Sequence, residues 1–265
     1  LELTKEDHEV LMDYCDKKNI QFMSTPFSFD TVDLLEEVSI DLYKVGSSDT
    51  NNLPLLKYIA KKDKPMILST GMSTLTEVSE AVDTILDTGN EKLIILHCVS
   101  NYPAEFENIN LKAMKTMKNA FDLEIGYSDH TLDIEVPIAA VAMGAKVIEK
   151  HFTLDKNMEG PDHKASLNPE ELKRMVKSIR NVEKALGNGI KKPSKNEKEN
   201  IKTVRKSLVV NSVKKRGQKI KKEDLNIKRP GTGIEPKYID KVVGLKLSND
   251  LKEDQTLKWN DFKDE

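Results

Sequence analysis

Two histidines, His130 and His151, each directly follow a short β-prone segment, and they stand 21 positions apart. An alanine-rich helical stretch closed by a glycine separates the two segments. In a parallel β-α-β unit both imidazoles would emerge at the same edge of the sheet, and with Glu149 and Asp162 they would suit a divalent metal. The alternative is two structural histidines, which the spacing alone does not exclude. A Gly-Pro-Asp-His loop at residues 160–163, expected at the same edge, favours a functional site.

The residues around this pair show a regular alternation of segments. Short apolar segments near residues 20, 42, 65, 93, 123 and 147 are each followed by a loop and a helix-like stretch. This alternation predicts a parallel sheet and suggests a (β/α)8 TIM barrel. Because the chain starts on a helix, we expect the first two barrel strands to lie upstream of Leu1. A six-stranded doubly wound sheet is the alternative, but no glycine-rich dinucleotide fingerprint follows any strand.

The chain is expected to divide into a barrel domain (1–189), a polar, basic linker (190–206) and a small β-rich domain (207–265). The small domain carries an internal repeat, because residues 218–225 match residues 255–262 at identical spacing. Each copy predicts a short strand followed by a turn that starts on aspartate. A Lys-Arg-Pro-Gly turn between the copies would present the guanidinium of Arg229.

Composition and charge narrow the possible functions. No apolar run approaches the roughly 18–20 residues that span a bilayer, and no signal peptide opens the chain, so a cytoplasmic protein is expected. Two cysteines are too few for a disulfide framework. Residues 1–189 hold 21 basic against 32 acidic side chains, and residues 190–265 hold 21 against 12. The basic segment lacks the interleaved aromatics of a nucleic-acid platform, so a lid over a site for anionic substrates fits better.

Motifs at the predicted strand ends resemble those of the sialic acid synthase family, the phosphoenolpyruvate-dependent synthases of nonulosonic acids. They are STPFS (24–28), YKVGSSDTNN (43–52), ILSTGM (67–72), LHCVSNYP (96–103), GYSDHT (126–131), EKHFTLD (149–155) and GPDHKASL (160–167). KRPGTGI (228–234) resembles the signature of the family's antifreeze-like, or SAF, domain. The resemblance implies a TIM barrel lacking its first two strands in this chain, and a homodimer in which each SAF domain caps the partner's active site.

The resemblance also implies roles for individual residues. Its metal ligands fall on His130 and His151, for a divalent ion, Mn²⁺ before Mg²⁺ or Co²⁺. The substrate-binding positions for phosphoenolpyruvate and its neighbourhood are Thr25, Lys44, Ser69, Ser100, Tyr102 and Ser128. Ser100 occupies a position that can be Asn in relatives.

The remaining implied roles concern the acceptor sugar and the reacting groups. Glu149 matches a contact to the carboxylate region, Asp162 a contact to the sugar hydroxyls, and Arg229 a capping arginine that meets the N-acyl group. Asp49 departs from the pattern, because many relatives have glutamate there. With the two histidines, Asp49 and Glu149 form the expected catalytic set.

The residue types suit this chemistry. A lysine inside an apolar strand is costly unless it meets an anion, and Lys44 with nearby hydroxyls would hold the phosphate and carboxylate of phosphoenolpyruvate. The alternative is that this lysine reaches solvent and the hydroxyls only cap helices. A metal on two imidazoles would polarise the aldehyde of N-acetylmannosamine for attack by C3 of phosphoenolpyruvate. Water, positioned by Asp49 or Glu149, would then add at C2 as phosphate leaves.

We therefore expect an N-acetylneuraminate synthase. Legionaminate or pseudaminate synthesis from a related 2-acetamido sugar is the alternative within the class. From another class, the chain would be a non-catalytic barrel that serves as a binding module. Nucleic acid and membrane are not expected as partners.

Overall fold

The computed structural model describes residues 3–262. The chain forms two compact units, residues 1–188 and 189–265. Among the helices of the described residues, none combines the length and the apolar character needed to cross a membrane.

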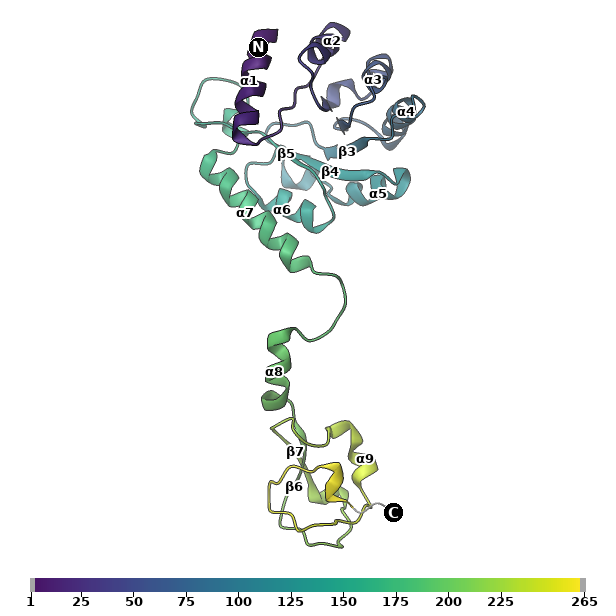
Figure 1. Cartoon of the computed structure of the whole chain (residues 1–265), viewed down its shortest axis with the longest axis vertical. Helices are drawn as coiled ribbons and strands as arrows, with labels where there is room; N and C mark the ends of the chain where they lie inside the picture. Colours follow the sequence, from purple (N-terminus) through teal and green to yellow (C-terminus); the bar gives the residue numbers. More distant parts are fainter. Residues whose placement is uncertain (1–2, 263–265) are drawn as a thin grey trace. The chain divides into compact units, whose positions relative to one another are not determined.

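The first unit is a parallel sheet whose strands alternate with helices along the chain (Figure 1). Its helices are α1 (Lys5–Lys18), α2 (Phe29–Glu37), α3 (Leu53–Ala60), α4 (Leu75–Leu86), α5 (Lys112–Phe121), α6 (Glu135–Ala142) and α7 (Pro169–Leu186). Its strands are β1 (Tyr43–Val45), β2 (Met66–Ser69), β3 (Leu93–Cys98), β4 (Glu124–Asp129) and β5 (Ile148–Lys150). The sheet runs in the order β1-β2-β3-β4-β5 with every neighbouring pair parallel, which is the arrangement of consecutive strands in a partial TIM barrel. The predicted α/β barrel class is confirmed.

Local sequence signals explain where several helices begin. Helices α1, α2, α4 and α7 each start with a capping box, in which the residue before the helix and the third helical residue satisfy each other's backbone donors. In α7 Asn168 accepts from the backbone of Glu171, and Pro169 takes the first helical position, where its missing N–H costs nothing. These signals fix where each of the four helices starts; α4 and α7 follow the carboxyl ends of β2 and β5, so the loops before them lie at one edge of the parallel sheet.

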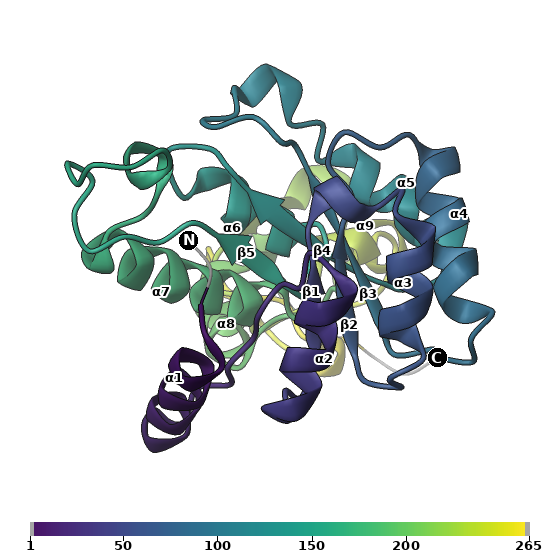
Figure 2. The ribbon, with the colours of Figure 1, turned by 90° about the horizontal axis from the view of Figure 1, so that it is seen from above.

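The strands separate apolar from polar side chains by their period of two. Helices cover one side of the sheet (Figure 2). The strand residues buried in the core beneath them are Tyr43, Val45, Met66, Leu68, Leu93, Ile95, Ile125 and Tyr127. The alternate positions face the other side, which we call the inner face. Lys44, Ser69 and Ser128 lie at these alternate positions, so the pattern that builds the core also directs these polar residues inward.

The predicted first strand, residues 20–24, is wrong. This stretch is mostly irregular, and its pairing reduces to one parallel bridge between Ser24 and Tyr43. Ile20 and Met23 are exposed there, so the stretch buries too little apolar surface to continue the ladder. Five strands rather than six therefore make up the sheet of the described residues.

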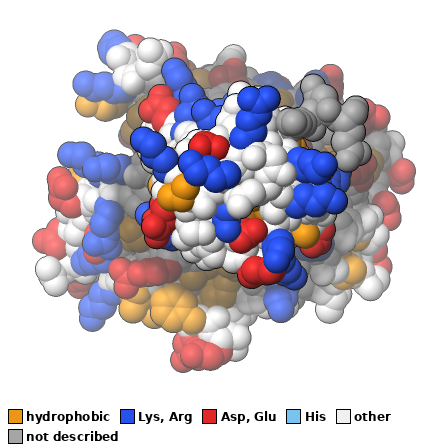
Figure 3. All heavy atoms as spheres, turned by 90° about the horizontal axis from the view of Figure 1, so that it is seen from below, with side chains coloured by type: hydrophobic (Ala, Val, Ile, Leu, Met, Phe, Trp, Pro, Cys, Tyr) orange, Lys and Arg blue, Asp and Glu red, His pale blue; other side chains and the backbone are white. Residues whose placement is uncertain are grey.

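The second unit contains α8 (Lys195–Val204), β6 (Ser207–Val210), β7 (Leu225–Lys228) and the short helix α9 (Ile239–Val242). Strands β6 and β7 are antiparallel, and they cover a small apolar core. Within the expected linker, residues 190–206, Lys195–Val204 form a helix, which starts at a capping box made by Ser194 and Glu197. Lysine and arginine side chains are spread over the visible face of this unit (Figure 3).

The predicted internal repeat is confirmed by its hydrogen bonds. Gln218 accepts from the backbone of Lys215, and 37 residues later Gln255 accepts from that of Lys252. Asp224 and Asp261 each accept from the backbone N–H three residues earlier, and each ends a 3-10 turn. The two copies meet where Lys214 and Leu251 exchange backbone hydrogen bonds of 2.9 and 2.8 Å. The two copies are thus alike, but the predicted form of each is wrong: a single bridge, at Lys219 and at Thr256, replaces the expected short strand, and the aspartate ends the turn rather than starting it.

Candidate active site

Three predicted residues from three strands meet on the inner face of the sheet. The Lys44 ammonium donates to Ser69 Oγ at 2.8 Å and to the Val45 carbonyl at 2.9 Å, and it lies 3.3 Å from Glu149 Oε1. Ser69 Oγ donates to the other oxygen of Glu149 at 3.3 Å. Lys44 is only 8% exposed, so it does not reach solvent, and the reading of a snorkelling lysine is wrong. A buried cation beside small hydroxyls is a suitable receptor for a phosphate or a carboxylate.

The two histidines meet beside this cluster. In the sheet register Ser128 of β4 pairs with Glu149 of β5, which brings the residues that follow these strands together. The ring centroids of His130 and His151 lie 5.2 Å apart and the rings cross at 68°. The Tyr102 ring packs 4.1 Å from His130 and 5.4 Å from His151, and so closes one side of the pair.

The hydrogen bond of His130 determines which of its nitrogens is available. Nδ1 lies 2.7 Å from the carbonyl of Val99, which can only accept, so Nδ1 carries the proton and Nε2 keeps a free lone pair. This arrangement is typical of histidines that bind a metal through Nε2. Within residues 3–262, no group of three or more His, Cys, Asp or Glu side chains is arranged to hold a metal ion. The imidazole pair therefore fits a metal whose other ligands are oxygens of water or substrate.

His151 lies in a setting that keeps it neutral. Burial, together with the neighbouring His130, lowers the pKa of His151 below its usual value, and Asp162 and Glu149 partly oppose this effect. Asp162 Oδ2 is 3.9 Å from His151 Nδ1, beyond hydrogen-bond distance. A neutral imidazole is the form that binds metal, so the lowered pKa favours that role.

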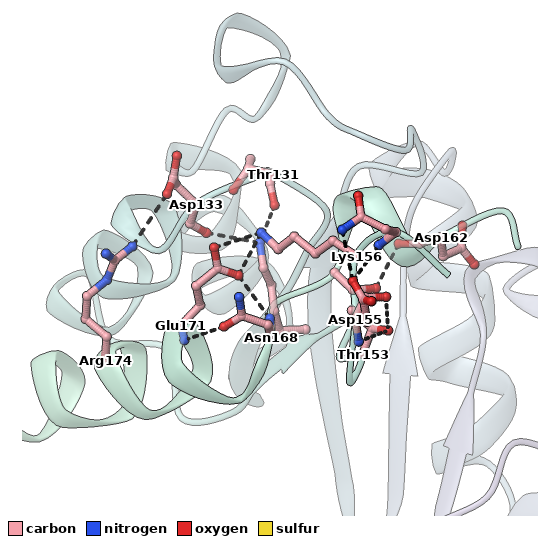
Figure 4. Close-up of polar contacts among 12 residues, drawn as sticks. Thr131, Asp133, Thr153, Asp155, Lys156, Asp162, Asn168, Glu171 and Arg174 are labelled. Atoms are coloured by element: carbon pink, nitrogen blue, oxygen red, sulfur yellow. Dashed lines mark hydrogen bonds and ion pairs between the residues drawn. The ribbon is translucent and has the colours of Figure 1, made fainter. Parts of the chain in front are cut away.

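The loop that carries Asp162 is tied to the start of α7 (Figure 4). Lys156 pairs with Glu171 at 2.7 Å, and Thr153 Oγ1 shares a 2.7 Å hydrogen bond with Nδ1 of His163. Ser166 donates to the Asp162 backbone carbonyl at 2.8 Å. These contacts hold the aspartate near the histidine pair.

A second group of hydroxyls surrounds Gly71, at the end of β2. The Gly71 N–H donates to Ser47 Oγ at 2.9 Å, and a Cβ at Gly71 would come within 2.2 Å of Ser100 Oγ. Only glycine allows this approach of the backbone to both hydroxyls. Thr25 lies one loop away, with its methyl 4.0 Å from the Cβ position of Gly46. The predicted residues Ser100 and Thr25 thus border the same edge of the sheet.

Asp49 bonds to neighbours other than the cluster of Lys44, Ser69 and Glu149 described above, and Arg229 belongs to the other unit. The Asp49 carboxylate accepts from Ser48 Oγ and from Asn52 Nδ2, both at 3.0 Å. Arg229 lies in the second unit, beside Pro230, whose carbonyl accepts from Ser207 at 2.7 Å. The roles assigned to these two residues remain predictions.

Two features of the site were not predicted from the sequence. His8 is buried and bonds through Nε2 to Ser24 Oγ at 3.2 Å, which supports the residue before Thr25. Asp129 and Lys150 form an ion pair on the helix-facing side of β4 and β5. The sequence signal for this pair was a charged residue of opposite sign directly before each histidine, Asp129 before His130 and Lys150 before His151.

Comparison with known proteins identifies the chain's relatives. It matches the NeuB family over residues 1–191 and the SAF domain over residues 215–263. It is 48% identical to an N,N'-diacetyllegionaminic acid synthase of Campylobacter jejuni, over 97% of this chain and 78% of that protein. The corresponding synthase of Legionella pneumophila is 47% identical, over 98% of this chain and 74% of that protein.

A solved structure supports the same assignment. The crystal structure of an N-acetylneuraminic acid synthetase from Leptospira borgpetersenii, in complex with citrate, superimposes with a TM-score of 0.71 at 38% identity. The match covers 76% of this chain and 70% of that one. The chain therefore belongs to the NeuB family of phosphoenolpyruvate-dependent nonulosonic acid synthases, and it carries a C-terminal SAF domain.

Proposed function

We propose that this synthase condenses phosphoenolpyruvate with a diacetamido sugar to give a legionaminate-type nonulosonic acid. The observation that carries the proposal is the cluster of Lys44, Ser69 and Glu149 beside the two histidines, in a chain 48% and 47% identical to two N,N'-diacetyllegionaminic acid synthases. Phosphoenolpyruvate has no nitrogen, so both acetylated amines of such a product come from the acceptor sugar. The expectation of N-acetylneuraminate has weaker support, since the N-acetylneuraminic acid synthetase is 38% identical.

Phosphoenolpyruvate would be held by the inner-face cluster. The Lys44 ammonium has three hydrogens, and Ser69 Oγ and the Val45 carbonyl accept two of them. The third faces the Glu149 carboxylate, which is 39% exposed, and an incoming anion would take the place of that carboxylate. Ser47, Ser100 and the Gly71 N–H add small polar groups next to this position. The proposed complex thus joins one buried cation to several neutral donors.

Members of the NeuB family generally depend on a metal, and the residues present fit one. His130 and His151 would hold it, and when bound it would polarise the aldehyde oxygen of the open-chain sugar. Mn²⁺ is our first candidate, because imidazole with oxygen ligands suits that class of ion. Tyr102 covers the rings and would limit the access of bulk water.

The remaining residues would orient the reacting atoms. C3 of phosphoenolpyruvate forms the new bond to the aldehyde carbon, and the resulting cation at C2 accepts water as phosphate leaves with its bridging oxygen. Glu149 lies between Lys44 and the histidine pair, and so would orient that water or the C2 carboxylate region. Asp162 would accept from a sugar hydroxyl near His151.

We further propose that the site is completed in a homodimer. Residues 1–189 carry an excess of acidic side chains and residues 190–265 an excess of basic ones, which favours docking of the SAF domain on a barrel. Arg229 would then reach the N-acyl group of sugar bound by the partner subunit, where its guanidinium can donate several hydrogen bonds.

Phosphate release with defined sugars tests the proposal. The protein would be given phosphoenolpyruvate and Mn²⁺ with either 2,4-diacetamido-2,4,6-trideoxymannose or N-acetylmannosamine. We expect kcat/KM to be at least tenfold higher for the diacetamido sugar, with Lys44→Met as the control whose phosphoenolpyruvate binding is weakened. A preference for N-acetylmannosamine would overturn the assignment to legionaminate and restore N-acetylneuraminate synthesis.

A further inference from the structure

A buried ion pair joins the two strand ends that carry the histidines. The Lys150 ammonium lies 2.5 Å from Asp129 Oδ2, and the two side chains are 2% and 0% exposed. The same ammonium donates to the carbonyl of Thr131 and, at 3.1 Å, to the carbonyl of Asp133. Three acceptors satisfy all three ammonium hydrogens. The pair lies on the helix-facing side of the sheet, opposite the site.

Stability alone is a weak reason for such a pair. Burying both charges costs several kcal/mol of desolvation, and well-packed apolar residues of similar volume often serve a fold equally well. The other ion pairs of the described residues are more exposed; the next most buried, Lys214 with Asp224, has side chains 16% and 17% exposed. A complete set of acceptors around Lys150 points instead to control of local geometry.

The contacts of the pair surround His130. Asp129 precedes it and accepts from the backbone N–H of Thr131 at 3.2 Å. The Thr131 hydroxyl lies 3.0 and 2.9 Å from the two oxygens of the same carboxylate, so the chain is held on both sides of the histidine. Figure 4 shows Thr131 and Asp133 in this network, with Arg174 of α7 3.7 Å from Asp133.

Lys150 in turn directly precedes His151. Side chains alternate along a strand, so fixing Lys150 toward the helices directs Glu149 and His151 toward the inner face. The register pairs Asp129 with Lys150, which makes this ion pair the cross-link nearest to both histidines.

We propose that Asp129 and Lys150 are positioning residues that set the separation and orientation of the His130 and His151 rings for metal binding. This inference rests on the proposed metal site. The pair acts from behind the sheet by joining the end of β4 to the end of β5. Without it, each histidine would sit on a strand end free to shift relative to the other, and the ring pair would be less well organised before the metal arrives.

The test removes the charges together. Lys150→Met alone would leave a buried carboxylate without a partner, so the first variant is Asp129→Asn with Lys150→Met, which keeps an oxygen for Thr131. Mn²⁺ affinity is measured from the electron paramagnetic resonance signal of the free ion, well below the melting temperature, and we expect a loss of about 10- to 100-fold. The affinity for phosphoenolpyruvate should fall by less than the affinity for Mn²⁺, because Lys44 and Ser69 lie on other strands and only Glu149 lies on β5.

A matched control separates positioning from stability. Glu36→Gln with Lys64→Met removes an ion pair of 2.6 Å in the same unit, away from the histidines, and should leave Mn²⁺ affinity unchanged. Asp129→Asn alone is the milder variant, and its affinity should lie between those of the wild type and the double variant. Wild-type Mn²⁺ affinity in folded Asp129→Asn, or in the folded double variant Asp129→Asn with Lys150→Met, would overturn the inference. Absence of Mn²⁺ binding by the wild type would overturn the metal site and the inference with it.

Discussion

Replacing Lys44 with methionine should separate substrate binding from stability. Methionine keeps most of the apolar length of lysine and removes the ammonium, which donates to Ser69 Oγ and the Val45 carbonyl and pairs with Glu149 Oε1. The site loses its buried cation, while the strand keeps a side chain of similar volume. The expected result is a folded protein that binds phosphoenolpyruvate poorly.

The size of the effect follows from the contacts. A hydrogen bond to a charged group contributes about 1.5–3 kcal/mol, so the loss of one such bond to phosphoenolpyruvate should weaken binding about 10- to 150-fold. The cost to folding should be small, because the Glu149 side chain is 39% exposed and can rehydrate when its partner is removed. We expect the free energy of unfolding to change by no more than about 1 kcal/mol.

Two measurements check this reasoning. Calorimetric titration with phosphoenolpyruvate gives the affinity, and urea denaturation gives the free energy of unfolding. Lys62→Met is the matched control, because Lys62 also forms an ion pair, 2.9 Å from Asp33, on the helical side of the sheet. If Lys44→Met stayed folded and bound phosphoenolpyruvate within threefold of the wild type, the inner-face cluster would not be the phosphoenolpyruvate site.

Three further predictions use other parts of the structure. Gly126→Ala should lower the free energy of unfolding by about 1–3 kcal/mol, because the added Cβ would lie 2.5 Å from the Val147 carbonyl. Gly46→Ala is the control and should be nearly neutral, because the nearest atom to its Cβ would be 3.7 Å away. Thermal denaturation of the two variants compares their stabilities. Burial lowers the pKa of His97 below the usual 6.5, so the unfolded chain takes up a proton that the native state does not. Stability should therefore fall as pH drops below about 6.5, and His97→Gln should flatten that slope in denaturation at several pH values; an unchanged slope would assign it to other groups. Mixed Arg229→Ala and His130→Ala subunits should regain up to about half the activity of one wild-type dimer, and no recovery after proven exchange would place the arginine outside the partner's site.

Much of the site could be predicted from the sequence because strand periodicity is a local property. An apolar segment that ends in a polar residue places that residue at the end of a strand, and β-α alternation brings such ends to one edge. Lys44, Ser69, Glu149 and His151 were assigned in this way together with the family motifs, and the structure brings the first three into contact.

The same local reasoning failed where pairing depends on distant partners. Residues 20–24 have the composition of a strand, but a strand also needs a neighbour over several residues, and only Ser24 finds one. The polar stretch before β6 was expected only as a linker, and a capping box at Ser194 starts a helix within it. At residues 20–24 the lack of a strand neighbour outweighed the composition. Before β6 the local capping box outweighed the polar composition.

The sequence by itself determined the barrel alternation, the residue types at the strand ends and the repeat in the small domain, because each depends on neighbours a few positions apart. Only the tertiary structure decided that Tyr102 covers both imidazoles and that Val99 selects the free nitrogen of His130, since a loop between strands makes these contacts. It also decided that Lys150 meets Asp129, 21 residues away, in the layer behind the site. Side-chain direction is set by strand parity, but the partner that a side chain meets is set by which strands lie side by side.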